Sequence, residues 1–174
     1  GSDLESWRSF HGLDFSALAA TSRKVAAQQC LFRNSLATKP AKLLELDLYS
    51  MSAREQEFDV RIRLRSLGSV GHDVHALAAW FTLDFFSVDR PGCTGFAAAQ
   101  RSKLSTHPDK PCTHWQQTLF LLARPVTLPA GATLDALMRV RRASWSQRDL
   151  SIQLTLDSAQ PQSAETFYIV GADI

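Results

Sequence analysis

The sequence predicts a mainly β fold, an antiparallel barrel or sandwich, preceded by a helical arm. Residues 44–48, 58–65 and 150–157 alternate strictly between apolar and polar side chains, which is typical of strands that bury one face. Turn-forming Gly, Pro and Ser residues separate the strand-like segments, and these segments do not alternate with helices. Several strands after one helical segment favour antiparallel pairing over a parallel α/β sheet.

Residues 3–39 are predicted to form the arm. Asp14 or Ser16 can cap a helix, because either side-chain oxygen can accept a hydrogen bond from a free amide of the first turn. Residues 19–29 are rich in Ala, Gln, Arg and Lys, so helix is predicted over residues 4–36. The arm carries apolar side chains that must be buried against another surface: Trp7, Phe10, Leu13, Phe15 and Leu18.

Residues 40–174 are predicted to form the β domain. Pro40 marks the change to two-residue periodicity. The run from 74 to 86 is apolar at nearly every position, which predicts a strand covered on both faces. Further strands are predicted at residues 113–122, 133–140 and 165–170.

The composition fits one folded domain and limits the class of function. The 174 residues are 45% hydrophobic with a net charge of +2, which argues against disorder and against a strongly electrostatic nucleic-acid binder. No apolar run of about 18 residues occurs, so no membrane-spanning helix is predicted.

The cysteines predict neither a zinc site nor a disulfide framework. Cys30, Cys93 and Cys112 are odd in number and widely spaced, so a reducing compartment, cytosol or nucleus, is expected. Cys112 has no charged base beside it in the sequence. It therefore fits a small, at least half-buried residue better than a reactive thiol.

The stretch from Leu104 to Trp115 holds the candidate functional residues. Two prolines three apart prevent a regular helix or central strand, and a strand-like run follows at once. Thr113, His114 and Trp115 therefore lie where a stiff loop enters a strand. From chemistry alone, His114 fits a structural residue, a general base or a group that orients a carboxylate. Trp115 fits core packing or a binding surface.

These motifs resemble those of the protein arginine N-methyltransferase family. The pattern L-S-T-x-P-x-x-P-x-T-H-W-x-Q resembles its Thr-His-Trp loop, and residues 75–85 resemble one of its barrel strands. Residues 9–18 resemble its dimerisation arm, and residues 121–134 resemble one of its turns. The spelling is type I-like, with some similarity to the coactivator-associated type in the arm. The matches occur in the family's order over nearly the whole chain.

The resemblance implies the C-terminal, substrate-binding and dimerisation half of an enzyme that moves a methyl group from S-adenosylmethionine to a protein arginine. It implies that His114 pairs with a carboxylate of the other half and that Trp115 lines the guanidinium pocket, with Thr113 in the same loop. It also implies that the apolar arm residues dock on a partner subunit. Because every second side chain of residues 75–85 is apolar and bulky, we expect a barrel core strand in which His75 is a structural residue with its hydrogen bonds satisfied. No Gly-rich turn follows a strand, so the S-adenosylmethionine site is expected in the N-terminal half and this chain alone is expected to be inactive.

Two other functions remain open. A non-catalytic paralogue that regulates or scaffolds a methyltransferase would look the same, because the residues that discriminate lie upstream. An unrelated β-sandwich could bind a ligand on Trp115 or Trp145. The row Arg61, Arg63 and Arg65 fits a charged edge strand better than an anion-binding surface. Expected partners are arginine-bearing proteins and a second subunit, with no membrane or nucleic acid. Gln116, where many family members have Lys or Tyr, leaves the substrate preference open.

Overall fold

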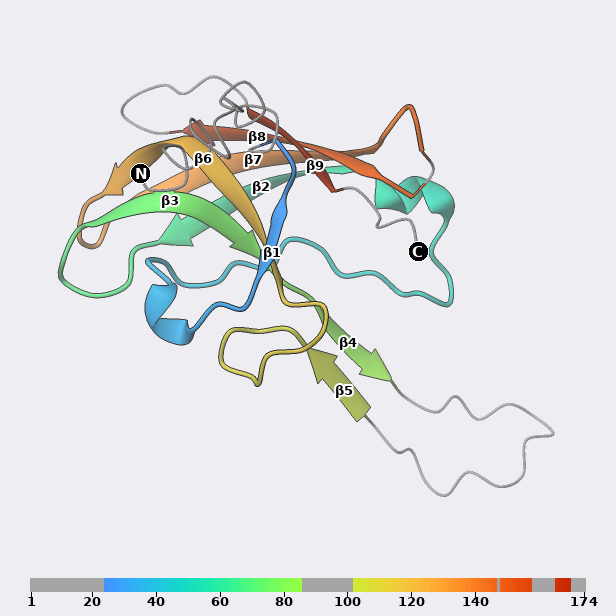
Figure 1. Ribbon diagram of the computed structural model, residues 1–174, viewed down its shortest axis with the longest axis horizontal. Helices are drawn as coiled ribbons and strands as arrows, with labels where there is room; N and C mark the ends of the chain where they lie inside the picture. Colours follow the sequence, from blue (N-terminus) through green and yellow to red (C-terminus); the bar gives the residue numbers. More distant parts are fainter. Residues whose placement is uncertain (1–23, 86–101, 147, 158–164, 170–174) are drawn as a thin grey trace, which may run out of the picture.

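Figure 1 shows the computed structural model, which describes residues 24–85, 102–146, 148–157 and 165–169. These residues are mainly antiparallel β, so the predicted fold class is confirmed. No helix among them is long and apolar enough to cross a membrane. Their elements are β1 (Ala27–Gln29), η1 (Arg33–Ser35), η2 (Ala53–Gln56), β2 (Phe58–Arg65), β3 (His72–Ala79), β4 (Thr82–Phe85), β5 (Ser102–Ser105), β6 (Gln117–Leu128), β7 (Thr133–Arg142), β8 (Leu150–Asp157) and β9 (Glu165–Ile169).

The strands form two main sheets and a separate pair. One sheet has the order β1-β6-β3 and the other has the order β2-β7-β8-β9. Among the described strands, β4 and β5 pair only with each other, and Figure 1 shows them extending away from the body of the domain. Every pair of strands in the described part of the chain is antiparallel.

Backbone hydrogen bonds join the two main sheets at one edge. The residues just before β1 run beside β9: the amide of Ala26 donates to Tyr168 O at 2.9 Å, and the amide of Tyr168 donates to Lys24 O at 2.7 Å. The Glu165 carboxylate accepts a hydrogen bond from Ala123 N of β6 at 3.1 Å. These bonds satisfy edge groups that would otherwise be open to pairing with another chain, and they give the domain its barrel-like shape.

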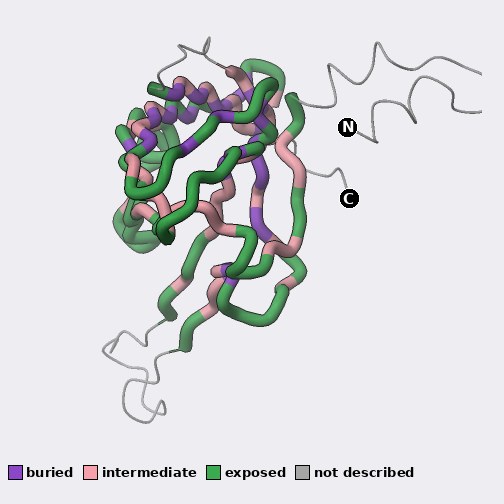
Figure 2. The backbone as a smooth tube through the Cα atoms, turned by 90° about the vertical axis from the view of Figure 1, so that its left-hand side faces the viewer, coloured by how far each residue is buried: buried purple, intermediate pink, exposed green. Residues whose placement is uncertain are grey.

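The core lies between the two main sheets. Leu154, Phe120 and Phe167 are almost fully buried, and the rings of Phe120 and Phe167 meet edge-to-face with centroids 5.5 Å apart. Figure 2 shows buried residues alternating with exposed ones along the strands. The alternation predicted at residues 58–65 and 150–157 is confirmed, because β2 and β8 occupy these ranges and every second side chain is buried or partly buried against the core.

The row of arginines lies on the outer face of β2, an edge strand of its sheet. Arg61, Arg63 and Arg65 are all exposed, as expected for a charged edge. Arg63 forms two hydrogen bonds to the Asp135 carboxylate, at 2.8 and 2.9 Å, across the β2–β7 pair. These bonds hold the pKa of Asp135 below its usual range.

The prediction of helix over residues 4–36 is wrong for its last part. Ala27–Gln29 forms β1, and Arg33–Ser35 forms only one turn of 3-10 helix. Ala and Gln favour helix, but pairing of β1 with β6 overrides that weak preference. Residues 4–23 lie outside the described residues, and the domain boundary between residues 39 and 40 stays a prediction.

The strand predicted at residues 44–48 is absent. This stretch pairs with no strand of the described chain, and Leu44, Leu46 and Leu48 are exposed. A two-residue period specifies a face, but a strand also needs a hydrogen-bonded neighbour.

The strand predicted over residues 74–86 is divided. β3 ends at Ala79 and β4 begins at Thr82, and neither is covered on both faces. A register shift between Val74 and Ala76 lies opposite Pro125 of β6, which has no amide to donate.

The remaining strand predictions hold with shifted ends. The strand predicted at 113–122 begins four residues later, at Gln117, because Thr113–Gln116 forms a turn. β7 and β9 confirm the strands predicted at 133–140 and 165–170, except that residue 170 lies outside the described part.

Candidate functional site

The Thr-His-Trp loop, residues 106–116, connects β5 to β6. In Figure 1 it lies below the three-stranded sheet β1-β6-β3. Thr113, His114 and Trp115 form its final turn, in which Gln116 N donates to Thr113 O at 3.1 Å. Gln116 has φ of 51°, in the left-handed region, and this sharp change of direction leads the chain into β6. His114 and Trp115 are therefore presented from a defined turn at the start of a strand, as predicted.

Trp115 lies against the chain between β3 and β4. Its ring meets the ring of Phe81 edge-to-face, with centroids 6.4 Å apart, and it also meets His114 at 5.9 Å. The Trp115 side chain is nevertheless 52% exposed, so one face is open. The alternative of pure core packing is thus wrong for Trp115. A half-exposed, edge-supported indole provides a flat binding surface.

Thr106, the first residue of the loop, is also attached to Phe81. It is 1% exposed, and its hydroxyl accepts a hydrogen bond from Phe81 N at 3.1 Å, while its own amide donates to Phe81 O at 3.0 Å. Because Phe81 also supports Trp115, both ends of the loop are fixed on one residue.

Gln117, the first residue of β6, joins three segments: β6, the start of the loop at Thr106 and the chain after β1 at Leu31. Its side chain is buried, and Nε2 donates to Thr106 O at 2.6 Å. Oε1 accepts from Leu31 N, also at 2.6 Å. A buried amide with both ends satisfied sets the distance between the two loop ends and attaches them to the chain after β1.

The middle of the loop is a tight polar turn. Asp109 N donates to His107 Nδ1 at 3.1 Å, and the ring of His107 meets Trp80 edge-to-face at 5.1 Å. Asp109 also lies 3.6 Å from Arg33 of η1, measured from Oδ1 to Nε. Pro108, between His107 and Asp109 in the sequence, is buried. The middle of the loop is therefore packed against the chain between β3 and β4 and held near η1.

The cysteine prediction is wrong in two respects. Cys30, directly after β1, and Cys112, directly before Thr113, form a disulfide whose Cα atoms are 5.9 Å apart. Cys112 is exposed rather than buried. Sequence spacing does not reveal such a pair, because the two residues are 82 positions apart and pairing depends on the fold. Cys93 lies outside the described residues.

The final turn has unused hydrogen-bonding capacity. The Thr113 hydroxyl is buried without a hydrogen-bond partner within the described part of the chain. Among the same residues, no carboxylate lies within ion-pairing distance of the exposed His114. No group of His, Cys, Asp or Glu that could hold a metal ion occurs in the ranges that the structure covers. The site thus presents an aromatic face and an imidazole, without an acid of its own.

The other candidate residues lie elsewhere. His75 is exposed on β3 at the register shift, so it is not part of a covered core strand as its apolar neighbours predicted. The arm residues Trp7, Phe10, Leu13, Phe15 and Leu18 lie outside the described residues, so their role stays a prediction.

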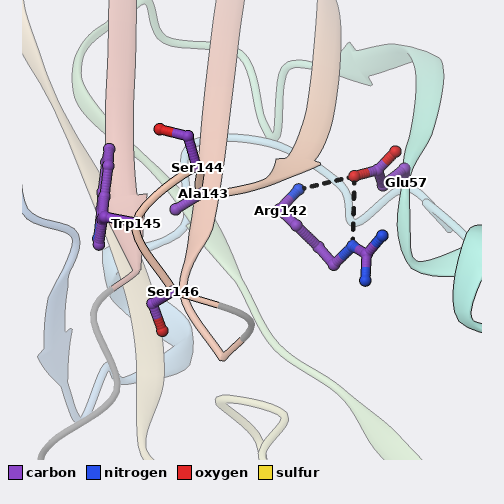
Figure 3. A pocket seen from close by; sticks show the side chains of 6 residues that line it. All are labelled: Glu57, Arg142, Ala143, Ser144, Trp145 and Ser146. Carbon is purple, nitrogen blue, oxygen red and sulfur yellow. Dashed lines mark hydrogen bonds and ion pairs between the residues drawn. The ribbon is translucent and has the colours of Figure 1, made fainter.

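A pocket of about 450 Å³ lies at the β7–β8 turn, and none of its lining residues belongs to the loop (Figure 3). Glu57 accepts a hydrogen bond from Arg142 N at 3.1 Å there, which lowers the pKa of Glu57. Trp145, the other candidate platform, donates to Asp149 Oδ2 at 2.9 Å and meets Tyr168 edge-to-face. It is 59% exposed.

The fold and the loop define a class of protein: an antiparallel β domain that presents an aromatic and an imidazole side chain from one loop. The family model described as "Arginine methyltransferase oligomerization subdomain" matches residues 1–161. The chain therefore belongs to the protein arginine methyltransferase family and corresponds to its C-terminal half. This result excludes the unrelated β-sandwich.

Relatives of known name agree with this assignment. The chain is 26% identical to protein arginine N-methyltransferase 1 of Schizosaccharomyces pombe, over 86% of this chain and 40% of that protein. It is 26% identical to protein arginine N-methyltransferase 1.1 of Arabidopsis thaliana, over 87% of this chain and 36% of that protein. The chain thus spans well under half the length of the curated relatives that it matches.

Two solved structures share the fold. The Trypanosoma brucei PRMT1 enzyme–prozyme heterotetrameric complex with AdoHcy matches 95% of this chain and 50% of its own, with a TM-score of 0.78 and 25% identity. The structure of Arabidopsis thaliana protein arginine methyltransferase 10 matches 97% of this chain and 51% of its own, with a TM-score of 0.72 and 20% identity. At that identity, the second match supports the fold alone.

Replacing Gln117 with Leu is expected to lower the free energy of unfolding by about 2–4 kcal/mol. The change removes two buried hydrogen bonds and leaves Leu31 N and Thr106 O without partners. Chemical denaturation of the variant and the wild type measures the difference. Gln153→Leu on the half-exposed outer side of β8 is the matched control and should change stability by less than about 0.5 kcal/mol. Equal losses in both variants would contradict the bridging role.

Proposed function

We propose that this chain is the substrate-binding and assembly part of an active protein arginine N-methyltransferase. The observation that carries the proposal is the loop at the start of β6, which holds Trp115 half-exposed against Phe81 and leaves His114 without a carboxylate among the described residues. Such a loop lacks the carboxylate partner that His114 would need in an active site. It can form an active site when a second domain brings acidic groups to face it.

The proposed role of the loop is to position the substrate and the opposing acids. A flat indole face suits the planar guanidinium cation of arginine, and an imidazole can hold a carboxylate by a hydrogen bond or an ion pair. That carboxylate would orient the guanidinium and accept its proton, so correct placement within a fraction of an ångström matters for the rate. The hydrogen bonds of Thr106 and Gln117 supply the required rigidity.

We propose that S-adenosylmethionine binds outside the described residues. Their sheets are antiparallel, and no Gly-rich turn after a strand is available to hold the cofactor. We therefore assign cofactor binding, and with it the methyl transfer, to a part of the full-length protein that precedes this chain. The proposed partners are arginine-bearing proteins and a second subunit, and the proposed location is the cytoplasm or nucleus.

A second candidate function is that of a non-catalytic subunit. It is supported by the similarity to a chain from a structure described as an enzyme–prozyme heterotetrameric complex. In that case the loop would serve assembly rather than substrate binding. The two candidates differ in whether the full-length protein methylates arginine without another subunit.

The 174-residue chain is expected to show no binding of S-adenosylmethionine, while the full-length protein binds it. Isothermal titration calorimetry on both measures this difference. Binding by the 174 residues would place part of the cofactor site in this chain. It would overturn the assignment of cofactor binding to another part of the full-length protein. Absence of binding by the full-length protein would favour the non-catalytic candidate.

In the full-length protein, His114→Ala is expected to lower kcat/KM for an arginine peptide by about 100-fold, because the opposing carboxylate loses its fixed position. His75→Ala is the matched control, since His75 is also exposed but lies on β3 away from the turn, and it should change kcat/KM less than about twofold. Steady-state kinetics with a peptide substrate provides the comparison. If both variants lose the same factor, His114 has no special role in the site.

The double substitution Trp7→Ala and Phe10→Ala is expected to convert an oligomer of this chain into a monomer. Large apolar side chains on an arm need a partner surface, and a symmetric dimer supplies it. Light scattering coupled to size exclusion measures the mass. Phe32→Ala, at an exposed aromatic residue after β1, should leave the mass unchanged. A wild-type chain that is already monomeric would contradict a docking role of the arm.

A further inference from the structure

The Cys30–Cys112 disulfide lies at the base of the Thr-His-Trp loop. Cys30 follows β1 directly, and Cys112 precedes Thr113 directly. The Cα–Cα distance of 5.9 Å lies in the usual range for a disulfide. We propose that this pair is a reversible thiol–disulfide site that fixes the loop to β1 when oxidised and releases its final turn when reduced.

The loop and its end at Gln117 are joined to the residues just after β1 at three points, and only the disulfide is covalent. The other two are the hydrogen bond from Leu31 N to the buried side chain of Gln117 and the ion pair between Arg33 and Asp109, 3.6 Å from Nε to Oδ1. Reduction would therefore leave Gln117 and the start of β6 in place while freeing Cys112. The effect would be confined to the turn formed by Thr113, His114 and Trp115.

The environment of Cys112 suits both redox states. Its sulfur lies 3.5 Å from Thr113 O, so the reduced thiol can donate a weak hydrogen bond to that carbonyl. In the oxidised state the same sulfur is joined to Cys30. The reduced thiol thus has a partner in the turn itself, and its release need not unfold the loop.

The pair is accessible to a thiol reagent. Cys112 is exposed and Cys30 is half-buried, so a small thiolate can reach Cys112. Exposed disulfides are the labile and regulatory ones, and disulfides of reducing compartments are usually transient or redox-sensing. The proposed cytoplasmic or nuclear location would therefore make the pair a sensor rather than a permanent link.

The co-reactant is a small dithiol or its cyclic disulfide. One thiolate of the dithiol attacks the Cys112 sulfur, the Cys30–Cys112 bond breaks, and Cys30 leaves as a thiolate that takes up a proton. The second thiol of the reagent then attacks the mixed disulfide, which releases Cys112 and forms the reagent's own disulfide. Two electrons pass from the reagent to the protein, and oxidation is the reverse of these steps.

The test is a redox titration of the 174-residue chain in mixtures of reduced and oxidised dithiothreitol. Free thiols are alkylated at each point, and peptides are mapped by mass spectrometry without further reduction. We expect a cross-linked Cys30–Cys112 peptide that is lost as both thiols become alkylated together. Cys93→Ser should give the same result. No cross-link under oxidising conditions, or a cross-link to Cys93, would overturn the proposal.

Hydrogen exchange on the same samples tests the release of the turn. Amides of residues 112–116 should exchange about tenfold faster or more after reduction, while those of β7 and β8 stay unchanged. Cys112→Ser under oxidising conditions should match the reduced wild type at these residues. Equal exchange in the two redox states would overturn the release. If Cys112→Ser alters exchange throughout, the comparison of the two states of the wild type still decides.

Only the effect on catalysis rests on the proposed function. In the full-length protein, reduction should change the KM for an arginine peptide in the wild type and leave it unchanged in Cys112→Ser. If the titration and the exchange behave as expected but no methylation occurs under any condition, the enzymatic proposal fails and the redox site remains. If methylation occurs but the pair never cross-links, the redox site fails alone.

Discussion

Pairing of β6 with both β1 and β3 is the constraint on which the barrel and the loop depend. The inward side chains of β6 meet the opposite sheet, as in the contact between Phe120 and Phe167. Its first residue, Gln117, ends the loop and holds it to the chain after β1. The strand that closes the core therefore also places His114 and Trp115, and any change that moves β6 moves the site with it.

Local periodicity was sufficient for strands whose partners have the same periodicity. β2, β7 and β8 lie side by side with matched inward faces, so each alternating pattern predicts its strand well. The same pattern failed at residues 44–48, where no neighbouring strand is present among the described residues. The helix prediction failed at Ala27–Gln29 for the opposite reason, since pairing with β6 outweighs the helix preference of Ala and Gln. In both cases the deciding contact is distant in the sequence.

The candidate site likewise combines a local feature that the sequence predicts with distant contacts that it does not. The turn that carries His114 and Trp115 is local, and its proline-rich approach makes it visible in the sequence. Its supports are not local: Gln117 bonds to Leu31, 86 positions away, and Cys112 bonds to Cys30, 82 positions away. A glutamine beside other polar residues and two widely spaced cysteines carry no signal of these contacts in the sequence. Only the three-dimensional arrangement of β1 beside β6 could reveal what holds the loop rigid.

The ion pair between Arg63 and Asp135 has a consequence for the way in which the sheet assembles. The two residues are direct partners in the β2–β7 ladder, so their charges meet only in the native alignment. A slip of β2 by one residue would break this pair and turn the arginine row toward the apolar interior, where unpaired cations are strongly disfavoured. The arginines thus favour the native register of β2 against β7 and disfavour misaligned pairing during folding.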